Sequence, residues 1–203
     1  MNRRNFLKMI SISTLGIYLN LFDETAAKNF FETAEPMIYK KFLQFKEYEK
    51  RLTTEIIVIH HTDKLNPQSN EPLDEDSTVE RIHKWHIEKN GWAGIGYHYL
   101  IRKNGMIEQG RLPEMIGAHV YGHNKNSIGI CLAGSFHSKV AKPTSEQIQS
   151  LKNLTLFLCR KYKINPSRKT ILGHRDLNSD TTCPGDNLYC KLQEIRNFCR
   201  KEI

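Results

Sequence analysis

Residues 55–63 read EIIVIHHTD, a run of β-branched residues that ends in two histidines. Apolar side chains stand at every position from Ile56 to Ile59, which is the pattern of a short strand buried on both faces. The polar side chains of His60 and His61 follow where this strand ends. The stretch therefore predicts a central strand with candidate functional groups at its carboxyl end.

Outward from this strand, helical and strand patterns alternate along the chain. Ser77 and Glu80 form a predicted capping box that starts a helix, and Asn90-Gly91 ends it. A second capping box at Thr144 and Gln147 opens a longer helix, which we expect Asn165-Pro166 to stop. The remaining predicted elements are strands at 96–102, 106–109, 127–133 and 170–172, a turn at 103–105, and a terminal helix after 185. This order predicts an α/β fold, a single domain with a central mixed β-sheet flanked by helices.

Composition restricts the class of protein. The 203 residues are 39% hydrophobic and 26% charged, with 30 Lys+Arg against 22 Asp+Glu and a formal net charge of +8. These values are typical of a globular chain, and the apolar runs are too short for a polytopic membrane protein. The basic residues are dispersed, so we expect no nucleic-acid partner. Attraction to other anionic polymers accounts for the excess charge equally well.

The N-terminus has the layout of an export signal. Arg3-Arg4 precedes an apolar stretch from Met9 to Phe22, and small residues follow at Ala26-Ala27. We expect residues 1–27 to be a twin-arginine-like signal that directs the chain to the periplasm or cell envelope, with no stable membrane span after its removal. The alternative is an amphipathic helix or a retained anchor. Residues 28–52, rich in Lys, Glu and Phe, are predicted as a helical or linker segment before a domain at 53–203.

Three side chains at predicted strand ends or in loops are candidate zinc ligands. His60 closes the first strand, His174 follows a later one, and Cys183 lies nine residues farther on. Two imidazoles and one thiolate suit tetrahedral Zn²⁺, and three protein ligands leave a fourth position for water. A histidine at a strand end is often only structural, and His61 could replace His60 as a ligand. His83 and His86, three apart on the predicted helix, are a further, weaker pair.

Five cysteines are an odd number, so disulfides cannot account for all of them. Cys131 and Cys159 lie in apolar runs and are predicted to be small buried residues. Cys190 and Cys199 flank a helical segment, and the sequence leaves open whether they form a disulfide.

Four strings occur in an order that resembles the zinc-dependent N-acetylmuramoyl-L-alanine amidases, the family of the phage amidase-type lysozymes and peptidoglycan recognition proteins. They are IIVIHHTD from residue 56, WHIEKNGWAGIGYHYLIRKNGMIEQGR from 85, GAHVYGHNKNSIGICLAGSF from 117 and GHRDLNSDTTCPGD from 173. The resemblance implies an amidase-like fold with Zn²⁺ held by His60, His174 and Cys183. It also implies a catalytic role for Tyr97. Thr181 lines the same site and is implied to take part in catalysis as well.

The resemblance further implies substrate-facing positions for His61 and His119. Two departures bear on mechanism. Phage members have Lys where this chain has Thr181, and related cytoplasmic enzymes have Glu where this chain has Cys131. The resemblance therefore implies neither a cationic side chain at position 181 nor a carboxylate base at position 131.

The implied activity is zinc-dependent hydrolysis, by a metal-activated water, of the amide between N-acetylmuramic acid and L-alanine in peptidoglycan. We expect a monomer that takes peptidoglycan or muropeptides as substrate. A non-catalytic peptidoglycan-binding module is the competing hypothesis, and a structural zinc protein is a more remote one.

Overall fold

A computed structural model of the protein describes residues 35–63 and 77–203, and the predicted signal at 1–27 lies outside these residues. A six-stranded sheet has the order β1-β4-β3-β5-β2-β6. Every neighbouring pair is parallel except β3 and β4, which form an antiparallel hairpin. The strands are β1 Ile38–Lys40, β2 Ile56–His61, β3 Tyr99–Ile101, β4 Ile107–Gln109, β5 Ser127–Leu132 and β6 Ile171–Gly173. The predicted mixed sheet is confirmed.

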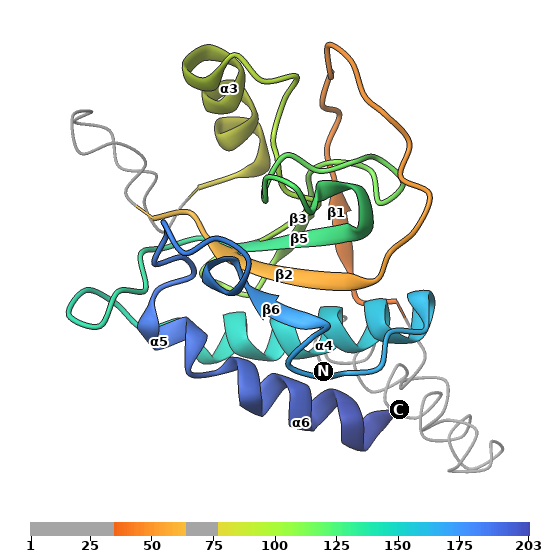
Figure 1. Cartoon of the computed structure of the whole chain (residues 1–203). Coiled ribbons are helices and arrows are strands. Elements are labelled where there is room, and N and C mark those ends of the chain that lie inside the picture. The colour runs from red at the N-terminus through yellow and green to blue at the C-terminus, as the bar shows by residue number, and fades with distance from the viewer. Residues whose placement is uncertain (1–34, 64–76) are drawn as a thin grey trace, which may run out of the picture. The chain divides into compact units, whose positions relative to one another are not determined.

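Helices cover both faces of the sheet (Figure 1). They are α3 Val79–Asn90, α4 Ser145–Tyr162, α5 Asp186–Tyr189 and α6 Leu192–Glu202, with short 3-10 turns η1 Asn124–Asn126 and η2 His174–Asp176. In the described part of the chain, no helix combines the length and apolar character needed to cross a membrane.

The alternation of side chains along the strands divides the core into two clusters. Ile130 and Leu132 of β5 belong to the larger cluster, which α4 and α6 cover. Cys131 between them belongs to the smaller cluster, with Val79 and Ile82 of α3. Because successive strand residues point to opposite faces, one buried strand contributes to both clusters. This explains why the central strands are apolar at almost every position.

The helix boundaries follow local capping signals. Thr144 and Gln147 form the predicted capping box of α4. The prediction for α3 is wrong by one residue, because Thr78 rather than Ser77 accepts the bond from the Arg81 N–H. Gly91 ends α3 as predicted, with a left-handed φ of 68° that glycine adopts without strain. The helix α4 ends at Tyr162, where Lys163 is left-handed, three residues before the predicted Asn165-Pro166 stop.

Residues 35–52, the described part of the segment 28–52 that was predicted as helical or a linker, contain no helix. This part contains the strand β1, which pairs with β4, and one compact unit begins at Pro36. Lys50 pairs with Met115, and the buried Arg51 guanidinium donates to the Ser127 carbonyl oxygen at 2.7 Å. The Lys, Glu and Phe content did not reveal these pairings because they depend on partners more than 50 residues away in the sequence.

Candidate metal centre

Two neighbouring parallel strands bring His60 and His174 together. In the register of β2 and β6, Ile59 lies beside Gly173. His60 and His174 come next along each strand, so both side chains leave the sheet at the same edge. Cys183 reaches this edge from the loop between η2 and α5. The fold therefore gathers the three predicted ligands from segments up to 123 residues apart.

The three donors have the spacing that a tetrahedral zinc ion needs. One donor atom of each of His60, His174 and Cys183 lies within 4.8 Å of the other two. The Nδ1 atom of His60 is 3.7 Å from the Cys183 sulfur. Zinc bonds of about 2.0–2.3 Å at tetrahedral angles separate a nitrogen and a sulfur ligand by about 3.6 Å. The donor set and its spacing fit zinc, and the histidine of β2 that belongs to this set is His60 rather than His61.

Burial sets the protonation of these donors. Desolvation lowers the pKa of His60 well below its usual value and also lowers the pKa of His174, so both imidazoles are neutral ligands. Burial raises the pKa of the Cys183 thiol to about 12, although the His61 backbone N–H, which points at the sulfur, acts in the opposite direction. A metal bound here would displace the thiol proton.

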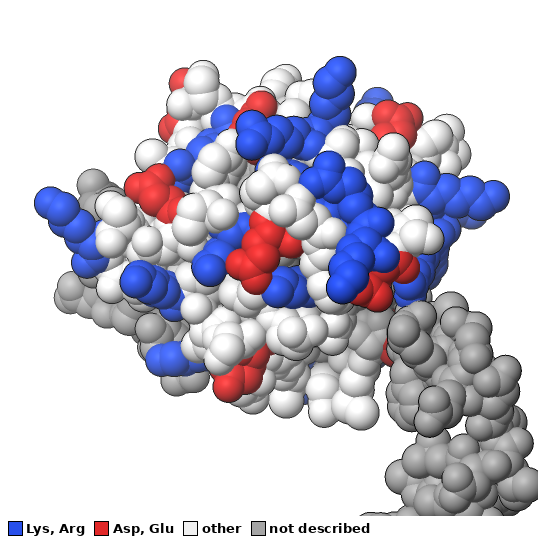
Figure 2. Space-filling model, turned by 90° about the horizontal axis from the view of Figure 1, so that it is seen from below, with Lys and Arg blue, Asp and Glu red and all other residues white. Residues whose placement is uncertain are grey.

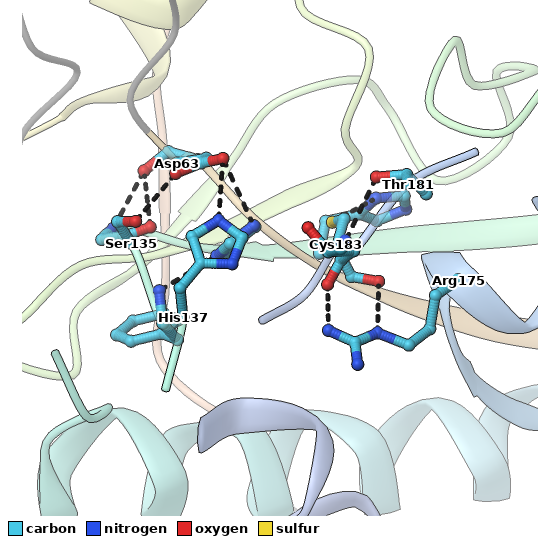
Figure 3. Close-up of polar contacts among 12 residues, drawn as sticks. Asp63, Ser135, His137, Arg175, Thr181 and Cys183 are labelled. Atoms are coloured by element: carbon cyan, nitrogen blue, oxygen red, sulfur yellow. Dashed lines mark hydrogen bonds and ion pairs between the residues drawn. The ribbon is translucent and has the colours of Figure 1, made fainter. Parts of the chain in front are cut away.

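The loop that carries Cys183 is held by side chains on both sides (Figure 3). Thr181 Oγ1 accepts from the Cys183 N–H at 3.1 Å. The Arg175 backbone N–H donates to the Cys183 carbonyl oxygen at 2.9 Å, and its guanidinium contacts the Thr182 carbonyl and Asp186. The sequence interpretation missed Arg175, although its position directly after His174 was an available signal.

Tyr97 lies beside the metal ligands. Its ring centroid is 5.2 Å from that of His60, and its hydroxyl interacts with the Cys131 thiol. Burial, with smaller contributions from Cys131 and Cys183, raises the pKa of Tyr97 well above its usual value. The side chain is therefore a neutral phenol that can donate a hydrogen bond. The strand position that carries Glu in some relatives is thus filled by a thiol in contact with Tyr97.

His119 lies behind His60 and is only 7% exposed. Its Nδ1 is 3.0 Å from His60 Nε2, and its Nε2 is 3.3 Å from the Ser127 hydroxyl oxygen. Glycines at 117 and 129 make room for this ring, because a Cβ atom there would approach it to 2.4 Å and 2.7 Å. The resemblance implies a substrate-facing position for His119, and in the structure its ring contacts His60, a candidate metal ligand.

The hydrogen bonds around His119 determine where each proton lies. Ser127 donates its hydroxyl proton to the His123 carbonyl oxygen at 2.7 Å, so its oxygen accepts from His119 Nε2–H. The other nitrogen of His119 is then an acceptor, and His60 Nε2–H donates to it. This leaves the lone pair of His60 on Nδ1, the atom that faces Cys183. The network therefore prepares His60 to bind a metal through Nδ1.

A second group, made of His61, Asp63 and His137, lies next to the metal centre (Figure 3). The His61 ring is buried, and its Nδ1 accepts from the Phe136 N–H at 3.1 Å, which leaves the proton on Nε2. Asp63 accepts from Ser135 at 2.7 Å and lies 3.1 Å from His137 Nε2. Because Nδ1 of His61 already accepts a hydrogen bond and its protonated Nε2 faces Asp63 at 3.9 Å, the ring has no lone pair free for an ion, and we interpret this group as a polar cluster rather than a second metal site. His137, predicted as a solvated loop residue, is half-buried here.

His83 and His86 on α3 use their nitrogens to hold the backbone before β3. Their Nδ1 atoms accept from the N–H groups of Ile95 and Gly96, at 3.2 Å and 3.0 Å. The His86 ring also contacts Trp92, with ring centroids 4.7 Å apart. These bonds favour the packing interpretation of the two histidines over metal binding.

Comparison with known proteins gives a consistent set of relatives. Residues 50–186 match the N-acetylmuramoyl-L-alanine amidase family. The endolysin of Enterobacteria phage T3 is 35% identical over 145 residues, which cover 70% of this chain and 87% of that protein. Peptidoglycan-recognition protein LB of Drosophila melanogaster is 35% identical over 121 residues, 60% of this chain and 50% of that protein. The endolysin amidase LysCS from Clostridium intestinale has a similar structure, with a TM-score of 0.69, 30% identity, and coverage of 81% of this chain and 98% of LysCS.

Proposed function

Because the chain belongs to the N-acetylmuramoyl-L-alanine amidase family, we propose that it hydrolyses the amide bond between N-acetylmuramic acid and L-alanine in peptidoglycan. A zinc ion held by His60, His174 and Cys183 would be its cofactor. One observation carries the proposal: two neutral imidazoles and one thiol converge within 4.8 Å, next to the Tyr97 phenol. Peptidoglycan or muropeptides are the substrate, and the protein acts as a monomer.

Each residue then has a role in hydrolysis. Zinc, when bound, polarises a carbonyl and lowers the pKa of a water molecule to about 7. The Tyr97 hydroxyl donates a hydrogen bond to the carbonyl oxygen of the scissile amide as negative charge develops on that oxygen. Thr181 lines the site and orients Cys183 through the 3.1 Å bond to its backbone N–H. No lysine stands at this position, so Tyr97 is the donor proposed from this chain.

The buried contacts of His119 and His61 favour supporting roles over substrate contact. His119 accepts from His60 and fixes its tautomer, so we assign it to positioning the ligand. The backbone N–H of His61 points at the Cys183 sulfur, and its ring anchors the segment at Phe136.

The competing function is recognition of peptidoglycan without cleavage, as the similarity to a peptidoglycan-recognition protein suggests. The complete donor set and the adjacent Tyr97 phenol favour hydrolysis. A binding module has no need to keep two neutral imidazoles, a thiol and a phenol at one point.

Digestion of purified peptidoglycan tests the proposal. We expect the protein to release free stem peptides, identified by mass, with release stopping on chelation and returning with Zn²⁺. Cys183→Ser should lose both bound zinc and activity, while the matched variant Cys190→Ser, at an exposed thiol, should keep both. Sugar–sugar cleavage, cleavage within the peptide, or binding without products would each refute the amidase proposal.

We also propose that the protein is exported to the periplasm or cell envelope through the twin-arginine-like signal at 1–27. Replacing Arg3 and Arg4 by Lys should keep the protein in the cytoplasm, as measured by cell fractionation. Unchanged export of this variant would contradict a twin-arginine route.

A further inference from the structure

The helices α4 and α6 pack side by side with a fixed register (Figure 1). Lys152 of α4 forms an ion pair with Glu194 of α6 at 2.6 Å, and its Nζ also lies 5.7 Å from the Phe198 ring centroid. Farther along, the Arg160 guanidinium donates to the Glu202 carbonyl oxygen. Because both contacts advance in the same direction along the two helices, α4 and α6 run roughly parallel. Basic side chains, with acidic ones among them, cover the face seen from below, the side on which α6 lies in Figure 1 (Figure 2).

Between these contacts the two helices bring together a pair of buried cysteines. Cys159 of α4 is 1% exposed and Cys199 of α6 is 0% exposed, and both belong to the larger core cluster. The two thiols interact, and this interaction raises the pKa of Cys159 and lowers the pKa of Cys199. We therefore take Cys159 as the partner of Cys199, because Cys190 is exposed whereas Cys159 and Cys199 are both buried.

We propose that Cys159 and Cys199 form a disulfide that links α4 to α6. Two geometric observations support this pairing: contacts on either side of the two cysteines fix the register of the helices, and both side chains are buried in the same core cluster. Formation of the S–S bond requires the two sulfurs to approach to about 2.05 Å.

The reaction requires a disulfide oxidant, either a low-molecular-weight disulfide or a protein disulfide oxidoreductase. The Cys199 thiolate attacks one sulfur of the oxidant, forming a mixed disulfide and releasing one thiol. Cys159, once deprotonated, attacks the Cys199 sulfur and releases the second thiol, so two protein thiols are oxidised and one oxidant disulfide is reduced. Cys199 lies in the last turn of α6, and transient opening of this turn gives the oxidant access.

The position of the link gives it a structural consequence. The covalent ring would run from Cys159 to Cys199 and would enclose β6 and η2, hence His174 and Cys183. Two of the three proposed zinc ligands would then lie within one closed loop. Closing a loop of this length restricts the unfolded chain more than the folded one, so the link stabilises the fold that holds the ligands.

Oxidation of the purified, zinc-loaded protein tests this inference. The protein is incubated in a buffer of oxidised and reduced glutathione, a few degrees below its unfolding temperature so that α6 opens transiently. We expect the intact mass to fall by the mass of two hydrogens, and peptide mapping should identify a peptide pair joined through Cys159 and Cys199. The unfolding temperature should rise by roughly 5–15 °C and return to its initial value with dithiothreitol.

Variants separate this pair from the other cysteines. Cys190→Ser should form the link as the wild type does, whereas Cys159→Ala and Cys199→Ala should each abolish both the link and the reversible rise in unfolding temperature. The wild-type comparison with and without dithiothreitol does not depend on how well either alanine variant folds. Five alkylatable thiols after oxidation, glutathione adducts alone, or a link through Cys131, Cys183 or Cys190 would overturn the proposal. None of these outcomes depends on whether the protein cleaves peptidoglycan.

Discussion

At the scale of single residues, the location of one proton decides which nitrogen of His60 is free. The bond from Ser127 to the His123 carbonyl determines the tautomer of His119, and His119 in turn determines that of His60. The lone pair on His60 Nδ1 therefore depends on a residue that does not itself reach the metal centre. Because such supporting histidines orient a ligand and raise its basicity, their loss weakens metal binding.

Replacing His119 tests this dependence. We expect His119→Ala to weaken zinc binding roughly 10–100-fold, because His60 loses its acceptor and its ring becomes free to rotate. Competition with a chromogenic chelator measures the affinity. His123→Ala is the matched control, since it keeps the backbone carbonyl that Ser127 uses. Unchanged zinc affinity together with a raised KM would return His119 to the substrate-binding role.

The Tyr97 hydroxyl is the second prediction at this scale. Loss of one donor to a developing oxyanion costs about 10²–10³ in turnover, so Tyr97→Phe should lower kcat by that factor. Zinc content should stay at the wild-type value, because the phenol is not one of the three donors. Tyr48→Phe, at an exposed tyrosine, controls for the substitution itself. A parallel loss of metal and rate would make Tyr97 structural.

At the scale of secondary-structure elements, the start of α4 joins a helix cap to the neighbouring hairpin. Thr144 Oγ1 accepts from the Gln147 N–H at 3.0 Å and donates to the Lys103 carbonyl oxygen at 2.8 Å. Gln147, buried below the cap, donates to the Ala133 carbonyl oxygen after β5 at 2.8 Å. One local signal in the sequence thus also fixes where the helix lies against the sheet.

Removing this cap should lower stability measurably. Thr144→Ala loses the acceptor for the Gln147 N–H and the bond to Lys103, so we expect the free energy of unfolding to fall by about 1–2 kcal/mol. Urea denaturation measures the change. Ser145→Ala next to it removes only an exposed hydroxyl that bonds to Glu146, and it should be close to neutral. Equal effects of the two variants would mean that the capping box contributes little.

At the scale of the whole molecule, buried neutral histidines make stability depend on pH. His98 lies in the interior, where its Nδ1 accepts from the Gly129 N–H and its Nε2–H donates to the Met115 carbonyl oxygen, at 3.0 Å and 2.9 Å. Desolvation, and then the positive charges of Arg51 and Arg111, lower its pKa to about 3. His119, 5.6 Å away between ring centroids, is the other titratable ring that faces it.

The sign of the effect follows from proton binding. His98 is protonated near pH 6.5 in the unfolded chain and only near pH 3 in the folded chain. The contribution of neutral His98 to the free energy of unfolding is therefore fully present above pH 6.5 and is lost as the pH falls toward 3. Between pH 7 and pH 5, this one group lowers the free energy of unfolding by about 2 kcal/mol, which corresponds to a fall of roughly 4–8 °C in the unfolding temperature. Calorimetry at both pH values measures it. His98→Asn, less stable at pH 7, should show a smaller drop; an unchanged drop would assign the pH dependence to other groups.

The sequence by itself determined the elements whose signals are local. The apolar run from Ile56 to Ile59 requires a buried strand, and the Thr144–Gln147 box requires a helix start, because periodicity and capping involve residues a few positions apart. It also predicted the candidate ligand set, since His60, His174 and Cys183 belong to strings that resemble one family as a group. Even so, only the register of β2 against β6 explains why the two histidines meet.

The tertiary structure alone decided the contacts between distant segments. It turned His119 toward His60, paired Cys159 with Cys199, made residues 38–40 a strand and joined His61 to Asp63 and His137. The physical reason is common to all four. Each contact depends on which faces the packed sheet and helices present to one another, and no local pattern of residues encodes a neighbour that is brought close only by the completed fold.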